Sequence, residues 1–267
     1  RQSTPRCALW DRRASPLRGR ENGAIIQFMR LIRISSLAAA GVLAAIVSAA
    51  PGEGWISLFN GQSLEGWHVA CKPEDKGQQY WTVRDGAITC DARGRGDHNY
   101  VWLISDGEYG DFELRLKVRA YRNSGVQVRS RYDEAAGWLD GPQVDIHPPA
   151  PFRVGLIYDE TRGTRRWIYP SLPNARIEES QAPHQFTWKY ADEGDGWNDL
   201  RIICQGTRVK TLLNGDVITD TDLAGILDDA DHRRHNVGLR GHIALQLHTK
   251  SALHMQYKDI QLRPLAD

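Results

Sequence analysis

Amide, guanidinium, carboxyl and imidazole side chains gather on two neighbouring segments of the sequence. In N-S-G-V-Q-V-R-S-R at residues 123–131 and in G-P-Q-V-D-I-H at 141–147, apolar residues alternate with polar ones. This period of two is typical of a strand with one face in a core. Exposed strand faces mostly carry Lys, Glu and other solvated groups, whereas this face carries planar hydrogen-bonding groups, which predicts a sugar-binding face. Its members are Gln127, Arg129, Arg131, Gln143, Asp145 and His147.

The number of acids on this face restricts its chemistry. An ordinary glycosidase needs two carboxyl groups about 5 to 9 Å apart, one as acid and one as nucleophile or base. The strand at residues 143–147 carries only Asp145. We therefore expect a reaction that a single base can perform, and not the direct cleavage of unmodified glucans.

Other residues extend the predicted site. In H-I-A-L-Q-L-H at residues 242–248, Gln246 and His248 lie on the face opposite two inward leucines. Trp138 and Trp167 occur in segments beside the polar face, where an aromatic ring could stack on a sugar. Asn123 precedes the first strand, where asparagine often fixes a turn.

A metal site is an alternative for some of these groups. Asp159 and Glu160 could bind a divalent cation such as Ca²⁺ together with backbone carbonyls, although an acidic pair in a loop is more often solvated. His147, His248 and Asp145 could instead hold a divalent metal that assists enolisation. The sequence leaves the cofactor unassigned.

The first fifty residues differ in composition from the rest. Residues 1–28 are rich in Arg, Ser and Pro, and we interpret them as an upstream segment outside the fold. From Met29, basic residues, an apolar run and small residues follow one another, as in a secretory signal peptide. We expect a signal peptide at 29–50 and one domain at 51–267, secreted to the periplasm or outside the cell. A membrane anchor is the alternative, disfavoured because the apolar run is shorter than ~20 residues.

The charge of the chain bears on its partners. The formal net charge is +1, but residues 1–50 hold eight arginines and two acids, so residues 51–267 hold 26 basic and 31 acidic residues. A mildly acidic domain lacks the basic surface that nucleic-acid binding needs. We expect a carbohydrate partner, no nucleic acid, and no stable membrane insertion after processing.

Turn signals and alternation predict an all-β domain. Asp85-Gly86 and Asn214-Gly215 each lie between alternating segments, as in two-residue hairpins. Residues 221–236 are the only candidate for a short helix, and the proline-containing segment 161–196 is expected to be an insertion or lid. Many short strands with almost no helix indicate a β-sandwich.

Three cysteines follow residue 50: Cys71, Cys90 and Cys204. An odd number leaves at least one free thiol. A Cys71–Cys90 bridge is compatible with an oxidising compartment, and the spacings match no zinc motif.

Nine phrases in order resemble one family, the bacterial 3-keto-disaccharide hydrolase domain family, over about residues 55–263. They are L-F-N-G-Q-S-L-E-G-W at 58–67, W-T-V-R-D-G-A-I at 81–88, Y-G-D-F-E-L at 109–114, N-S-G-V-Q-V-R at 123–129, G-P-Q-V-D at 141–145, Y-D-E at 158–160, W-N at 197–198, L-N-G at 213–215 and I-A-L-Q-L-H at 243–248. The resemblance implies a concanavalin-like jelly roll of two curved antiparallel sheets, with a sugar site on the concave face. It also implies activity on glycosides already oxidised at C3. Many relatives carry Glu where this chain has Gln143, and Gln where it has Asp145.

A 3-keto sugar would need only one base. The ketone acidifies the C2 proton, so its removal expels the C1 group by β-elimination, and water then adds to the double bond. Asp145 is the first candidate for the base and His147 the second. Arg129 or His248 would stabilise the enolate oxygen, and Gln127, Gln143 and Gln246 would hold hydroxyl groups.

Two alternatives stay open. Asp145 could pair with Arg129 across the strands, which would not exclude catalysis. The same fold could also serve as a non-catalytic, lectin-like carbohydrate-binding domain.

Overall fold

The computed structural model describes residues 54–266, except 121, 149–152, 173–186 and 191–194. The chain divides into two units at residues 46–47, and the described residues all belong to the second unit. The predicted upstream segment (1–28) and signal peptide (29–50) lie outside the described residues. Among those described, no helix is long and apolar enough to cross a membrane.

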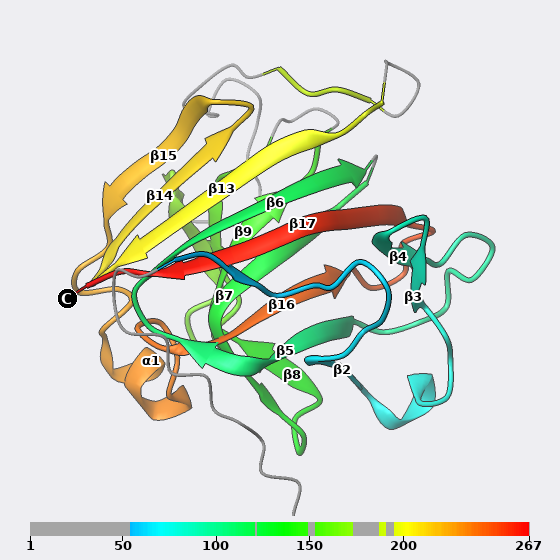
Figure 1. Ribbon diagram of the computed structural model, residues 1–267. Coiled ribbons are helices and arrows are strands. Elements are labelled where there is room, and N and C mark those ends of the chain that lie inside the picture. The colour runs from blue at the N-terminus through cyan, green and yellow to red at the C-terminus, as the bar shows by residue number, and fades with distance from the viewer. Residues whose placement is uncertain (1–53, 121, 149–152, 173–186, 191–194, 267) are drawn as a thin grey trace, which may run out of the picture. The chain divides into compact units, whose positions relative to one another are not determined.

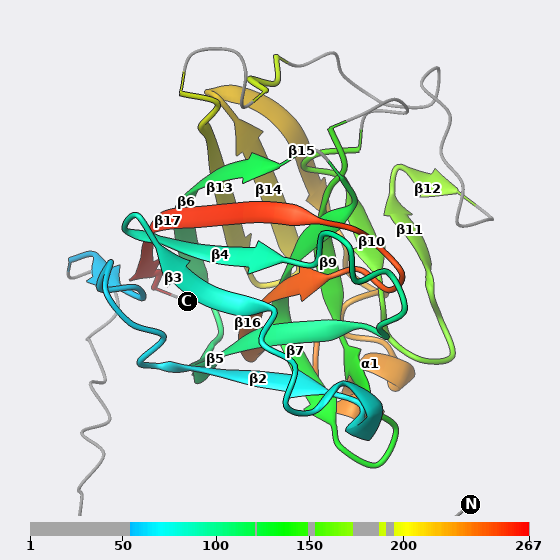
Figure 2. The same cartoon turned by 90° about the vertical axis from the view of Figure 1, so that its right-hand side faces the viewer.

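Two antiparallel sheets form the second unit, as Figures 1 and 2 show. The eight-stranded sheet has the order β15-β14-β13-β6-β17-β4-β3, with β1 paired to β17. Its strands are β1 (Ile56–Ser57), β3 (Trp81–Arg84), β4 (Ala87–Asp91), β6 (Phe112–Ala120), β13 (Asn198–Gln205), β14 (Arg208–Leu213), β15 (Asp216–Asp222) and β17 (His254–Pro264).

The nine-stranded sheet carries most of the predicted site. Its order is β12-β11-β10-β9-β7-β16-β5-β2, with β8 paired to β7. Its strands are β2 (Trp67–Cys71), β5 (Val101–Tyr109), β7 (Ser124–Asp133), β8 (Trp138–Asp140), β9 (Pro142–Ile146), β10 (Ile157–Asp159), β11 (Arg166–Tyr169), β12 (Ser171–Leu172) and β16 (Gly241–Leu247). This architecture confirms the predicted all-β jelly-roll sandwich of two curved antiparallel sheets.

The core lies between the sheets because each strand turns its apolar residues inward. In β6, Phe112, Leu114, Leu116 and Val118 are buried in the main core cluster. Val126 and Val128 of β7 and Val144 and Ile146 of β9 enter the same cluster from the other sheet, as alternation predicted; these four are at most 1% exposed. The polar residues between them therefore face away from the core.

Both predicted hairpins are confirmed, and one other prediction changes. Asp85-Gly86 and Asn214-Gly215 take the left-handed conformation that joins β3 to β4 and β14 to β15. The segment 221–236, predicted to form a short helix and a loop, has its helix near the end: α1 spans Ala230–His235. The segment predicted as a lid begins instead with β11 and β12, which extend the sheet, and 173–186 and 191–194 within it lie outside the described residues.

The three cysteines after residue 50 are buried and free. Cys71 lies in β2 of the nine-stranded sheet, and Cys90 lies in β4 of the other sheet. The structure therefore contains no Cys71–Cys90 bridge.

Arg129 does not lie on the polar face, contrary to the alternation of the sequence. A bulge in the pairing of β7 with β16 gives Arg129 a φ of 50°, which changes the direction of its side chain. The guanidinium binds Asp111 Oδ1 at 2.7 Å and donates to the carbonyl oxygens of Gly110, Gly206 and Gly238. Arg129 thus joins three turns at one end of the sandwich, and Asp145 pairs with another arginine.

This placement predicts a structural role for Arg129. Replacing Arg129 by Met removes the donor to three carbonyl groups and leaves the Asp111 carboxylate with the Gly206 amide but no cation, so we expect a loss of about 3–5 kcal/mol in the free energy of unfolding. Arg131→Met is the matched control, because the Arg131 side chain is 33% exposed and pairs with Glu108 at the surface; its loss should stay within about 1 kcal/mol. Denaturant unfolding measures both, and equal losses would contradict the assignment.

Candidate functional site

The register of four strands brings the polar residues of the predicted site together. In the pairing of β7 with β9, Gln127 lies opposite Gln143, and Gly125 lies opposite Asp145. On the other side of β7, β16 adds Gln246, whose neighbours Leu245 and Leu247 point into the core. On the far side of β9, β10 places Tyr158 opposite Gln143. One face of the sheet thus carries amides, a carboxyl and a phenol side by side.

A cavity of about 180 Å³ lies on this face. It brings together six residues that the sequence singled out, among them Glu160, which was predicted only as a metal ligand. Four further residues complete the wall. The lining consists of Asn123, Gln143, Asp145, Glu160, Trp167 and His248, with Tyr100, Arg153, Tyr158 and Arg165.

A chain of amide hydrogen bonds leads to Asp145. Gln246 Nε2 donates to Gln143 Oε1 at 2.7 Å, and Gln143 Nε2 donates to Asp145 Oδ1 at 3.2 Å. Gly125 makes room for this arrangement, because a Cβ atom there would lie 2.3 Å from Cδ of Gln143. Gly125 of the N-S-G-V segment therefore allows the Gln143 amide to take the position in which it donates to Asp145.

Asp145 is a buried carboxyl with one guanidinium beside it. Only 4% of the residue is exposed, and this burial raises its pKa to about 6 against the lowering effects of Arg153 and Gln143. Arg153 Nε lies 3.4 Å from Asp145 Oδ2 in an ion pair that lacks hydrogen-bond geometry. Asp145 is thus a stronger base than an ordinary aspartate, and it is mostly ionised at neutral pH.

Glu160 is a second buried carboxyl in the same cavity. Burial is the main cause that raises its pKa to about 7, and the charges of Asp145 and Asp159 act in the same direction. Arg165 opposes them from 3.0 Å. The expectation of a single acid, drawn from the strand at 143–147 alone, is therefore wrong for the cavity as a whole.

Trp138 contacts both the backbone of Glu160 and the guanidinium of Arg165, the ion-pair partner of Glu160. The Trp138 Nε1 group donates to the carbonyl oxygen of Glu160 at 2.8 Å. The guanidinium of Arg165 lies 4.5 Å from the centre of the same indole ring. Trp138 does not line the cavity; it supports the Glu160–Arg165 pair, and its ring face toward Arg165 is occupied.

His248 is a neutral histidine with both nitrogens in contact with protein groups. Burial lowers its pKa. Its Nδ1 lies 3.0 Å from the carbonyl oxygen of Thr249, which can only accept, so Nδ1 carries the proton. Nε2 then accepts from the Tyr100 hydroxyl at 3.2 Å. In this tautomer His248 has no free donor for an enolate oxygen.

Several cavity residues have buried polar atoms without a hydrogen-bond partner among the described residues. A buried polar atom without a partner costs about 1–3 kcal/mol. Hydroxyl groups and ring oxygens of a sugar can serve both donors and acceptors. The atoms are Asn123 Oδ1, Asp145 Oδ2, Arg153 Nε and Trp167 Nε1.

Three other predicted residues do not line the cavity. Gln127 is fully buried beneath the face and donates to the carbonyl oxygen of Leu139 at 3.3 Å. Gln246 is also fully buried and acts through Gln143. His147 follows the last residue of β9, and its Nδ1 is buried without a hydrogen-bond partner in the described part of the chain.

Asp159 and Glu160 do not share a site. Asp159 points into a different polar cluster, where it accepts from the Thr161 amide at 2.9 Å and lies 3.4 Å from His232 Nε2. Within the described part of the chain, no group of three His, Cys, Asp or Glu side chains is arranged to hold a metal ion. The alternation of Y-D-E explains the separation, because Tyr158 and Glu160 face the cavity and Asp159 faces the other way.

No pattern in the sequence indicated that the arginines of the cavity belong to the site. Arg153 and Arg165 lie in loops, where no period predicts a direction. Tyr100 precedes β5 and had no distinguishing neighbour. Tyr158 and Glu160 carried a usable signal, since the alternation of β10 places both on the face of Gln143.

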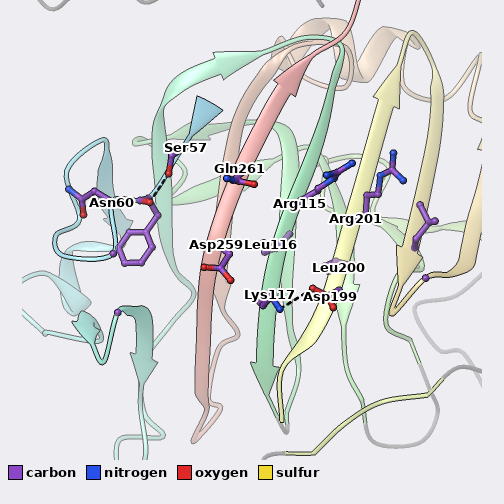
Figure 3. A pocket seen from close by; sticks show the side chains of 15 residues that line it. Ser57, Asn60, Arg115, Leu116, Lys117, Asp199, Leu200, Arg201, Asp259 and Gln261 are labelled. Carbon is purple, nitrogen blue, oxygen red and sulfur yellow. Dashed lines mark hydrogen bonds and ion pairs between the residues drawn. The ribbon is translucent and has the colours of Figure 1, made fainter. Parts of the chain in front are cut away.

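A larger pocket of about 680 Å³ lies on the outer face of the eight-stranded sheet (Figure 3). Its acids, Asp199 and Asp259, are exposed, and Lys117 pairs with Asp199 at 3.6 Å. Arg115 and Arg201 are both paired with Glu113. Because this pocket offers only exposed acids and cations already paired, the smaller cavity is the better candidate for chemistry.

The two raised pKa values predict a pH dependence of stability. Unfolded carboxyl groups titrate near 4, so the folded state binds more protons until the pH exceeds about 6 for Asp145 and about 7 for Glu160. Their contribution is therefore most favourable at low pH and is lost as the pH rises through these values. The Tm of the double variant Asp145→Asn/Glu160→Gln minus the Tm of the natural protein should therefore rise from pH 5 to pH 8.

The control for this prediction is a pair of exposed acids. Asp97→Asn/Glu134→Gln changes the same two residue types at the surface, and its Tm difference should stay nearly constant. Thermal unfolding at five or six pH values measures both series. Parallel curves for the two double variants would show that the cavity acids titrate normally.

Comparisons with known proteins identify related sequences and folds. A family described as a 3-keto-alpha-glucoside-1,2-lyase-like domain matches residues 54–263. A search of curated proteins found no match.

Solved structures with similar folds include several carbohydrate-related proteins. A predicted glycosyl hydrolase from Parabacteroides distasonis is 17% identical over 80% of this chain and 94% of its own, with a TM-score of 0.48. A carbohydrate-binding module from Bacillus subtilis is 13% identical over 74% of this chain and 95% of its own, with a TM-score of 0.45. A Bacillus subtilis protein of unknown function with a galectin-like fold is 11% identical, covers 75% and 90%, and has a TM-score of 0.47. At such identities and scores, these likenesses carry no argument about activity.

Proposed function

The chain belongs to the 3-keto-alpha-glucoside-1,2-lyase-like domain family, and on this premise we propose that it cleaves 3-keto-glycosides by removing the C2 proton and expelling the C1 group. The observation that carries the proposal is Asp145. It is a buried carboxyl with a pKa of about 6 that lines the cavity, and its buried Oδ2 has no hydrogen-bond partner among the described residues. The family match also confirms the resemblance seen in the sequence phrases.

The chemistry follows from the ketone at C3. A proton on C2 is acidified by this neighbouring carbonyl group, so a carboxylate can remove it. The resulting enolate expels the C1 substituent, which leaves a C1–C2 double bond to which water can add. A general base must be unprotonated at the working pH and within reach of the proton, and Asp145 is ionised at pH 7.

Arg153 takes the role that the sequence analysis gave to Arg129 or His248. Its guanidinium lies beside Asp145, and its Nε is buried without a hydrogen-bond partner among the described residues. A cation next to the base can bind the C3 oxygen as it becomes negative. Arg129 lies at the end of the sandwich, and His248 lacks a free donor.

The remaining cavity groups fit a single sugar unit. Asn123 Oδ1 can accept a hydroxyl proton, and Trp167 Nε1 can donate to an oxygen. The volume of about 180 Å³ is below the roughly 300–1,000 Å³ of pockets for drug-sized ligands. We infer that the oxidised sugar occupies the cavity and that the aglycone lies outside it.

We also propose that the protein works outside the cytoplasm. The support is the order of basic, apolar and small residues between Met29 and Ala50. N-terminal sequencing of protein exported from its host would test this: a start near residue 51 is expected, and retention of residues 29–50 would contradict it.

Replacing Asp145 by Asn tests the base directly. Aglycone release from a 3-keto-glucoside should fall by about 10²–10⁴-fold, the usual contribution of a general base, while binding measured by calorimetry persists. Asp97→Asn, at an exposed position, is the matched control and should keep full activity. Unchanged turnover by Asp145→Asn would rule out this base.

The parent glucoside distinguishes the alternative functions. The natural protein should not release aglycone from it, because its C2 proton is not acidified. Release from the parent would indicate an ordinary glycosidase. Binding of the 3-keto-glucoside without any release would instead support a lectin-like module.

Gly125→Ala tests the amide chain behind Asp145. The added Cβ would displace Gln143 and break its hydrogen bond to the base, so kcat should fall by about 10²-fold, as a displacement near 1 Å can cause. Gly96→Ala is the control, because a Cβ at Gly96 would meet no atom within 4 Å. Steady-state kinetics of the two variants decide: equal rates would show that the position of Gln143 does not matter.

A further inference from the structure

We infer that Glu160 is a second catalytic residue, the general acid that protonates the departing glycosidic oxygen while Asp145 acts as the base. This inference rests on the proposed function and adds to it a division of labour between two carboxyls. It also predicts that one cavity performs both the elimination and the addition of water.

The strand register places both carboxyls on one face of the sheet. The amide of Asp145 donates to the carbonyl oxygen of Leu156 at 2.9 Å, and the amide of Glu160 donates to that of Gly141 at 3.0 Å. The two acids therefore lie at opposite ends of the paired segment, four strand positions or about 13 Å of backbone apart. Both side chains nevertheless line the same cavity.

Each carboxyl has its own cationic partner. Arg153 lies 3.4 Å from Asp145, and Arg165 lies 3.0 Å from Glu160. Both ion pairs line the same cavity. The reaction has work for two carboxyls, because a proton leaves C2 while the glycosidic oxygen departs from the neighbouring C1.

The environments of the two acids suit opposite roles. Burial raises the pKa of both acids, that of Asp145 to about 6 and that of Glu160 to about 7, and the charge of Asp145 also raises the pKa of Glu160. An acid whose pKa lies near 7 can carry the proton that a leaving group needs. The Trp138 bond to the Glu160 carbonyl holds the acid's backbone in place.

The proposed steps conserve atoms and charge. In the elimination, the C2–H bond breaks and its proton moves to Asp145, the C1–C2 double bond forms, and the C1–O bond breaks as its oxygen takes the proton of Glu160. In the addition, Glu160 removes a proton from water, the hydroxide oxygen bonds to C1, and C2 regains a proton from Asp145. The sum is hydrolysis, with both carboxyls returned to their initial states.

The test uses two 3-keto-glucosides that differ only in the leaving group. Loss of methanol needs an acid, whereas loss of 4-nitrophenolate does not. In Glu160→Gln, release of methanol should fall by about 10²–10⁴-fold, and release of 4-nitrophenolate should stay within a few-fold of the natural rate. Exchange of the C2 proton of the methyl substrate in D₂O, followed by NMR, should persist because Asp145 is intact.

Control variants separate catalysis from a structural effect. Glu134→Gln changes an exposed glutamate and should leave all three rates unchanged. Glu160→Asp keeps the acid and should restore part of the methanol release. Equal losses for both leaving groups, together with loss of exchange, would show that Glu160 only shapes the cavity and would overturn the inference, as would unchanged methanol release.

The natural protein serves as the test of the premise. If it releases neither methanol nor 4-nitrophenolate from these substrates, the proposed function fails and this inference fails with it. If it releases both and Glu160→Gln treats both alike, only the role of Glu160 is overturned.

Discussion

The burial of two carboxyl groups in one small cavity is the constraint on which the rest of the site depends. A carboxylate removed from water is costly unless hydrogen bonds and opposite charges support it. Asp145 receives the Gln143 amide and lies beside Arg153, and Glu160 lies beside Arg165. The residual cost shows as raised pKa values. A site that holds two acids with pKa values near neutral pH can both take protons from a substrate and donate protons to it.

The sandwich supplies this site because each strand has two different faces. The inward residues of β7 and β9 pack against the eight-stranded sheet and fix the strand positions. The outward residues are then held in register, so that Gln246, Gln143 and Asp145 form a connected chain. The Gln143 side chain crosses Gly125 so closely that a larger residue would clash with it. The position of the Asp145 carboxyl is thus fixed by the packing of the opposite face of the sheet.

Alternation explains what the sequence could predict. The polar face with Gln143 and Asp145, both hairpins and the sandwich follow from the period of two and from turn residues. Arg129 was misplaced because a bulge interrupts that period, and nothing in the sequence marks it. Arg153 and Arg165 come from loops, whose directions depend on tertiary contacts. Glu160 was read as a loop acid, although its spacing from Tyr158 already placed both on one face.

The most direct test of the account follows hydrogen at C2 during turnover. The natural protein is given a 3-keto-glucoside in D₂O, and the released sugar is analysed by NMR at early times against an enzyme-free control. Removal of the C2 proton followed by addition of water predicts deuterium at C2 in every product molecule for which the proton on Asp145 has exchanged with D₂O, and a substrate that carries deuterium at C2 should react more slowly. A product that keeps its original C2 proton, together with an equal rate for the C2-deuterated substrate, would show that the glycosidic bond is cleaved directly and would contradict the central role of Asp145 as the base.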